Sequence, residues 1–119
     1  MKRTLVIGAS ENTERYSNKA VRSLLAHNIP VLALGIKAGK IEGVEIKTGF
    51  PNFENIDTVS LYVGPKNQHV YSDYILSLKP KRIIFNPGAE NPELEKKAGE
   101  KGIETLNACT LVMLSVGNF

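Results

Sequence analysis

The chain has 119 residues, the length of one ordinary domain, and 42% of them are apolar, which is enough for a hydrophobic core. The net charge is only +3 and the basic residues are spread along the chain, which suits an anionic small molecule better than a nucleic acid. Cys109 is the only cysteine, and no apolar run is long enough for a signal peptide or a membrane span. These features predict a single cytoplasmic domain over residues 1–119.

The first third of the chain predicts a strand, a loop and a helix. Residues 5–7 form a short apolar run, as in a strand that is buried on both faces. A polar loop over residues 9–16 follows, and Ser17 is the expected N-cap of a helix with apolar residues at helical spacing. Asn28 can adopt the left-handed conformation that ends a helix, and Pro30 prevents its continuation.

The middle of the chain predicts two further buried strands. The first covers residues 31–34, and the second covers residues 58–63. Between them, residues 36–56 are expected to be irregular apart from a short strand at 44–46. A helix then ends before Pro80. Its expected apolar face consists of Val70, Tyr71, Tyr74, Ile75 and Leu78.

The last third predicts two more strands and two helices. A strand is expected at residues 82–85, followed by a helix with Asn91 as its N-cap and Gly102 just beyond its end. A final strand at residues 103–106 precedes a short helix at 110–116. Since strands and helices alternate, the chain predicts a three-layer, doubly wound, Rossmann-like α/β fold. Its parallel sheet has about five strands, with helices on both faces.

Ligands of open α/β sheets bind beyond the carboxyl ends of the strands, at the switch in strand order. Four predicted strand ends carry a glycine in this position. They are Gly8-Ala9-Ser10, Gly35-Ile36-Lys37, Val63-Gly64-Pro65 and Asn86-Pro87-Gly88. Because these loops should meet at one edge of the sheet, we expect a binding site there.

The loop after the first strand favours a phosphate. Gly8 allows a tight turn, Ala9 is small, Ser10 offers a hydroxyl, and the free amides of the following helix N-terminus point to the same place. The loop does not match the G-x-G-x-x-G fingerprint of dinucleotide sites, because Ser10 and Thr13 stand where glycines are required.

The end of the second strand bears on the choice of cofactor. An NAD site places Asp or Glu there to accept the ribose hydroxyls, whereas this chain has Lys37 and Lys40. An ammonium group can pair with a ribose phosphate, as in coenzyme A or NADP. The lysines thus disfavour NAD, although they could also be ordinary solvated loop residues.

The order of short motifs along the chain resembles the small stand-alone CoA-binding-domain proteins, whose fold is similar to the nucleotide-binding domain of the succinyl-CoA synthetase α subunit. The matching segments are 6–10, 16–18, 28–31, 41–43, 56–59, 86–91 and 107–109. The chain departs from the family at Gly35-Ile36, where Asn-Pro is usual, and at Gly64-Pro65, where a bulky polar residue is common. The resemblance implies coenzyme A or an acyl-CoA as the ligand.

The motifs and the resemblance together define a set of candidate cofactor-binding residues. They are Gly8, Ala9, Ser10, Asn12, Arg15, Tyr16, Ser17, Gly35, Ile36, Lys37, Lys40, Val63, Gly64, Asn86, Pro87, Gly88 and Glu90. No metal ligands are predicted, since two histidines and one distant cysteine do not form a metal site.

Catalytic patterns are largely missing from the sequence. His27 and His69 are expected at the surface or at helix ends, and Cys109 as a small buried hydrophobe. Glu90 is the carboxylate expected to overlook the cleft, either as a turn residue or as a base. We therefore predict a non-enzymatic CoA-binding module without nucleic-acid or membrane partners. The alternatives are an NADP-type reductase and a regulatory subunit, and a second copy or a partner enzyme subunit is left open.

Overall fold

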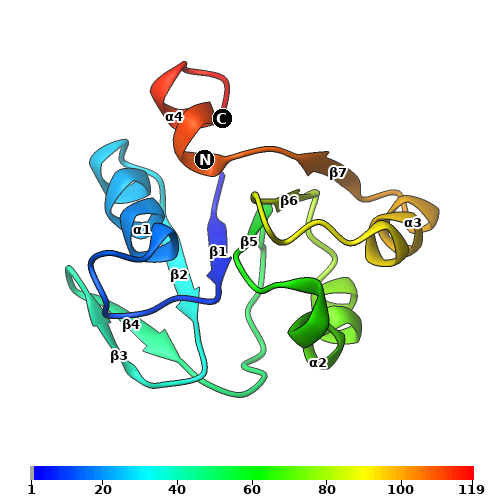
Figure 1. Ribbon diagram of the computed structural model, residues 1–119, viewed down its shortest axis with the longest axis horizontal. Coiled ribbons are helices and arrows are strands. Elements are labelled where there is room, and N and C mark those ends of the chain that lie inside the picture. The colour runs from blue at the N-terminus through cyan, green and yellow to red at the C-terminus, as the bar shows by residue number, and fades with distance from the viewer. Residues whose placement is uncertain (1) are drawn as a thin grey trace.

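A seven-stranded sheet forms the centre of the molecule (Figure 1). The computed structural model describes residues 2–119, so Met1, the first residue of the predicted domain, lies outside the described residues. The strands are β1 (Thr4–Ile7), β2 (Val31–Leu34), β3 (Gly39–Ile41), β4 (Val44–Lys47), β5 (Thr58–Leu61), β6 (Arg82–Phe85) and β7 (Glu104–Asn107). The helices are α1 (Tyr16–Ala26), α2 (Pro65–Ser77), α3 (Pro92–Glu100) and α4 (Thr110–Ser115).

The strand order is β3-β4-β2-β1-β5-β6-β7, and every neighbouring pair is parallel except β3 with β4. The prediction of an α/β fold with a mostly parallel sheet is therefore confirmed, but the predicted number of about five strands is wrong. The segment predicted to be irregular contains the antiparallel hairpin β3–β4. Glu42 and Gly43 both have positive φ, at 45° and 86°, which is the backbone of a tight two-residue hairpin turn.

Strand β1 lies between β2 and β5, and this arrangement positions the site. Thr4 of β1 is in register with Val31 of β2 on one side and with Thr58 of β5 on the other. The chain first moves outward from β1 to β2, and it later returns to the opposite side of β1 through β5. The switch in strand order therefore lies between β1 and β5, at the edge where their carboxyl ends meet.

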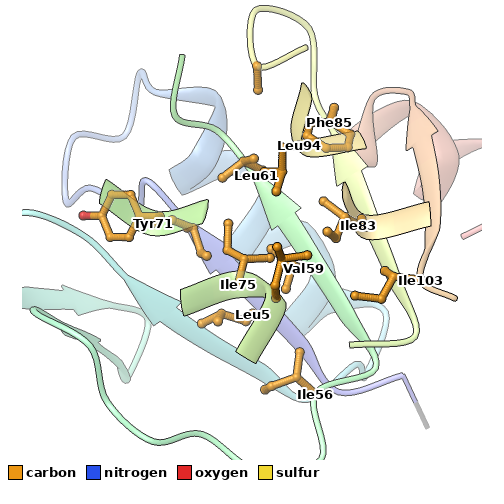
Figure 2. Close-up of a cluster of buried hydrophobic side chains, with 14 of the residues drawn as sticks. Leu5, Ile56, Val59, Leu61, Tyr71, Ile75, Ile83, Phe85, Leu94 and Ile103 are labelled. Atoms are coloured by element: carbon orange, nitrogen blue, oxygen red, sulfur yellow. The ribbon is translucent and has the colours of Figure 1, made fainter. Parts of the chain in front are cut away.

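The two faces of the sheet bury separate cores. Figure 2 shows the core under α2 and α3, where side chains of β1, β5 and β6 meet Ile75 and Leu94 of the helices. On the other face, Val6 and Ile46 pack with Val21 and Leu24 of α1 and with Leu114 of α4. Successive strand residues point to opposite faces, so both faces need a helical cover. None of the helices in residues 2–119 has the length and apolar character needed to cross a bilayer.

The predicted ends of α1 and α3 agree well with the structure. Asn28 has a φ of 60° just after α1, and Gly102 has a φ of 77° just after α3, as expected for helix stops. Asn91 caps α3, because its side chain accepts a hydrogen bond from the amide of Leu94 at 3.2 Å. The start of α1 was predicted wrongly: Arg15, with an extended backbone, is the N-cap, and Ser17 is buried inside the helix.

Helix α2 starts earlier than its apolar pattern predicts. Pro65 is its first residue, because the fixed φ of proline suits the first turn of a helix. The buried side chains are Gln68, Tyr71, Ile75 and Leu76, whereas Val70 is 52% exposed. Val70 was therefore wrongly assigned to the core-facing side.

Candidate functional site

A cleft of about 780 Å³ lies at the carboxyl edge of the sheet, within the roughly 300–1,000 Å³ typical of cofactor sites. The loops after β1, β2 and β5 and the first turns of α2 line it. Nine predicted site residues lie on its wall: Gly8, Ala9, Ser10, Asn12, Arg15, Ile36, Lys37, Val63 and Gly64. The wall also contains residues that the sequence reasoning did not assign to it: Glu11, Ala38, Tyr62, Asn67, His69, Val70 and Tyr71.

Gly8 makes the turn under the cleft. Its φ is +97°, and a Cβ at this position would lie 3.2 Å from the Cβ of Tyr62. The amides of Gly8 and Ala9 both donate to the carbonyl oxygen of Leu34, at 2.9 and 3.0 Å. Glycine is thus required here both by the backbone conformation and by the close neighbour, as the sequence predicted.

The rest of the β1–α1 loop is held by its own side chains. The hydroxyl of Ser10 accepts from the amide of Asn12 at 3.1 Å, and the side chain of Asn12 accepts from the amide of Glu14 at 2.9 Å. Asn18 donates to the carbonyl oxygen of Ser10 at 2.9 Å, and Arg22 donates to Asn18 at 2.7 Å. The loop is therefore preorganised, and sequence reasoning missed Asn18 and Arg22 because their role depends on contacts within the folded loop.

Some backbone amides in this loop and at the start of α2 are free to bind a ligand. Within residues 2–119, the amides of Ser10, Glu11 and Gly64 have no hydrogen-bond partner in the protein. Helix α1 begins directly after Arg15, so its N-terminal amides and partial positive charge lie at the other end of the same loop. Together with the side chains of Arg15 and Lys37 on the wall, these groups form a site suited to an anion.

The loop after β2 differs in part from its prediction. Ile36 is 93% exposed and lines the cleft together with Lys37. Gly35 is buried behind the wall, where a Cβ would lie 2.4 Å from the carbonyl oxygen of Ala9, so its role is to let the two loops approach. Lys40 lies on β3 in register with Glu45 and outside the cleft wall. The sequence did not place Lys40 outside the cleft wall because β3 and its pairing with β4 were not foreseen.

Tyr16 and Ser17 were also predicted to contact the ligand, and neither lines the cleft. Tyr16 is 67% exposed, and the ammonium group of Lys19 lies 5.1 Å from the centre of its ring. Ser17 is buried in the first turn of α1. Because the helix begins one residue before the predicted cap, both side chains are rotated away from the loop.

The loop after β6 supports the site from behind instead of lining it. Asn86 is buried and donates to the hydroxyl of Ser60 and to the carbonyl oxygen of Leu61, both at 3.0 Å. Its side-chain oxygen accepts from the amide of Thr110 at 2.8 Å, which joins β6 to the start of α4. The polar groups of the Asn86 side chain are therefore already used within the fold, and Asn86 is not on the cleft wall.

The three other predicted residues of this loop are exposed outside the cleft wall. The carboxylate of Glu90 accepts from the amide of Gly88 at 2.9 Å and so closes its own turn. Pro87 precedes that turn and is exposed as well. Of the two roles considered for Glu90, the turn residue is the one that the structure shows, and its expected position over the cleft was wrong.

Gln68 connects the two loops on this side of the sheet. Its side chain is fully buried and donates to the carbonyl oxygens of Val63 and Ala89, at 2.6 and 2.5 Å. Its own carbonyl oxygen accepts from Asn91 at 2.9 Å. A polar residue in the first turns of a helix looks exposed in a sequence, so only its position opposite two loops reveals this role.

Tyr62 and Cys109 lie close together beside the cleft. The hydroxyl of Tyr62 is buried without a hydrogen-bond partner in residues 2–119. Burial raises the pKa of Tyr62 to about 12, and the neighbouring Cys109 adds to the shift. Cys109 is the N-cap of α4 and only half-buried, so the prediction of a buried small hydrophobe was wrong. His69, the fifth residue of α2, is exposed at the surface, and a ring nitrogen lies 3.2 Å from the carbonyl oxygen of Lys66.

Comparison with known proteins identifies the family. The family described as the CoA binding domain matches residues 2–115. The chain belongs to this family. None of the curated proteins matches the chain. A crystal structure of an uncharacterized protein is 50% identical, covers 100% of this chain and 98% of its own, and has a TM-score of 0.97.

Two other solved structures share the fold of this CoA-binding-domain chain. A hypothetical protein from Pyrococcus horikoshii OT3 is 26% identical, with a TM-score of 0.87 and coverage of 97% of this chain and 82% of its own. A protein from Thermus thermophilus is 21% identical, with a TM-score of 0.86 and coverage of 99% and 90%. The second likeness, at this low identity, concerns the fold alone.

Proposed function

We propose that the cleft binds coenzyme A or an acyl-CoA and that the domain catalyses no reaction on it. The observation that carries the proposal is the anion site in the β1–α1 loop, where the amides of Ser10 and Glu11 are free beside Arg15. A diphosphate group is a suitable ligand for free backbone amides that lie near a cationic side chain. Membership of the CoA-binding-domain family supports coenzyme A as the molecule that carries it.

The rest of the cleft suits the other parts of such a ligand. Lys37 provides a positive charge after β2, on the side where Rossmann-like sheets hold the ribose. Ile36 and Val70 are 93% and 52% exposed and offer apolar walls to an adenine ring. A cytoplasmic location and a partner subunit or second copy remain predictions.

A thermal-shift series tests the proposal against NADP, the ligand of the alternative reductase. A ligand at a hundred times its dissociation constant stabilises the native state by about 2.7 kcal/mol. For a domain of this size that corresponds to a rise in Tm of roughly 10 °C. We expect this rise with coenzyme A, and we expect little effect from NADP or from pyrophosphate, the control for a simple anion. A larger rise in Tm with NADP than with coenzyme A would contradict the proposal and favour NADP as the ligand.

A further inference from the structure

Glu11 reaches from the β1–α1 loop to the hairpin β3–β4. Its carboxylate oxygen Oε2 accepts a hydrogen bond from the amide of Lys40 at 3.0 Å. A Cβ on Gly39 would lie 2.4 Å from the carboxyl carbon of Glu11, so the carboxylate rests directly on the glycine backbone. The missing side chain at position 39 thus makes room for a carboxylate at this edge of the cleft.

The negative charge of Glu11 is not neutralised by a neighbouring side chain. Glu11 is the only carboxylate among the residues that line the cleft within residues 2–119. Arg15 and Lys37 also line the cleft, but neither forms an ion pair with Glu11 within 4.0 Å. A ligand that enters this side of the cleft therefore meets a carboxylate that can still accept hydrogen bonds.

The position of this carboxylate indicates which part of the ligand it meets. Nucleotide-binding sheets hold the ribose near the end of the second strand, where an acidic side chain accepts the ribose hydroxyls. In this chain the residues after β2 include Lys37 and no acidic residue before β3, but the fold brings Glu11 across to this segment. A carboxylate accepts hydrogen bonds from hydroxyl groups and repels a phosphate at the same place.

We propose that Glu11 makes the cleft select an adenosine ribose with free hydroxyl groups over one that carries a phosphate. The inference rests on the proposed function and specifies it further: dephospho-CoA, which lacks the ribose phosphate, binds at least as tightly as coenzyme A. Glu11 acts here as a specificity-determining residue, and its hydrogen bond to Lys40 holds its carboxylate in place.

Calorimetric titration of both ligands against the wild type and Glu11→Gln tests this role. Glutamine keeps an oxygen for the amide of Lys40 and removes only the charge, so the loop stays attached to β3. We expect the affinity ratio to shift toward coenzyme A by about threefold or more in Glu11→Gln, with a smaller shift at high salt. Glu14→Gln, an exposed change in the same loop outside the cleft wall, should leave the ratio unchanged.

Two other outcomes separate the inference from the proposed function. A wild type that binds coenzyme A tighter than dephospho-CoA, with the same ratio in Glu11→Gln, would show that Glu11 only attaches the loop to β3. The selectivity inference would then fail while the CoA proposal stands. A wild type that binds neither ligand would overturn the proposed function and the inference with it.

Discussion

Tyr62 buries a hydroxyl group that has no hydrogen-bond partner in residues 2–119. An unpaired buried hydroxyl costs free energy, because it has lost its hydrogen bonds to water. Its raised pKa has the same origin, since burial disfavours the charged phenolate. The backbone and Cβ of Tyr62 lie against Gly8, where the chain turns under the cleft.

Tyr62→Phe should therefore be neutral or stabilising by up to about 1 kcal/mol at neutral pH. Tyr74→Phe is the matched control, because the hydroxyl of Tyr74 donates to the carbonyl oxygen of Pro51 at 2.5 Å, and its loss should cost about 1 kcal/mol. Urea unfolding of the two variants and the wild type measures both effects. A loss of more than 1 kcal/mol in Tyr62→Phe would show that its hydroxyl has a partner.

The raised pKa of Tyr62 predicts that the free energy of unfolding depends on pH. The pKa of Tyr62 is about 12 in the folded protein and 10.0 in the unfolded chain, so the folded state holds the proton more tightly. The stabilisation linked to this proton is complete below pH 10 and is lost as the pH rises through 12, by about 2.7 kcal/mol in total. Tyr62→Phe should lack this decrease, so its stability relative to the wild type should increase across this range.

At the scale of elements, Gln68 of α2 holds the loops after β5 and β6 in position. Its three hydrogen bonds satisfy the carbonyl oxygens of Val63 and Ala89 and the side chain of Asn91. Val63 is part of the cleft wall, so this buried amide links the stability of α2 to the shape of the site.

Gln68→Leu should destabilise the domain by about 2–4 kcal/mol, because a leucine of similar volume leaves buried polar groups without partners. Denaturant unfolding measures the loss. Lys66→Ala, an exposed change in the first turn of the same helix, should alter stability by less than about 0.5 kcal/mol. Equal effects of the two changes would contradict the role of Gln68 as a connection between loops.

The elements that the sequence predicted well are those with a strong local signal. Strands β1 and β6 are buried along their whole length, and each contains a run of three apolar residues, at 5–7 and 83–85. Strand β3 has only three residues and one buried side chain, Ile41, so its existence depends on pairing with β4. The sequence predicted a short strand at 44–46, which overlaps β4, but it did not predict β3, on which Lys40 lies.

The sequence placed residues on the cleft wall where backbone geometry decides, and it did not foresee which side chains turn inward. Gly8 to Ser10 line the cleft because the loop after the first strand lies at the switch point. Asn86 follows a strand in the same way, but its amide is used to join β6 to α4. Glu11 was missed because nothing in its local sequence shows that it reaches β3.

At the scale of the whole molecule, the two cores hold the sheet edge rigid from both sides. Helices α1 and α4 cover one face, and α2 and α3 cover the other (Figure 1). The β1–α1 loop and the start of α2 therefore meet at the switch point with fixed backbones. This arrangement holds the free amides of the β1–α1 loop in place beside the cleft.

The central claim is that a diphosphate of the CoA type binds the free amides of the β1–α1 loop. Amide proton–nitrogen NMR spectra recorded during a titration with coenzyme A test it most directly. We predict that the largest shifts occur at Ser10, Glu11 and Gly64, whose amides have no partner in residues 2–119. Shifts confined to the shallow pocket between α2 and α3, around Ser72 and Lys97, would contradict the claim.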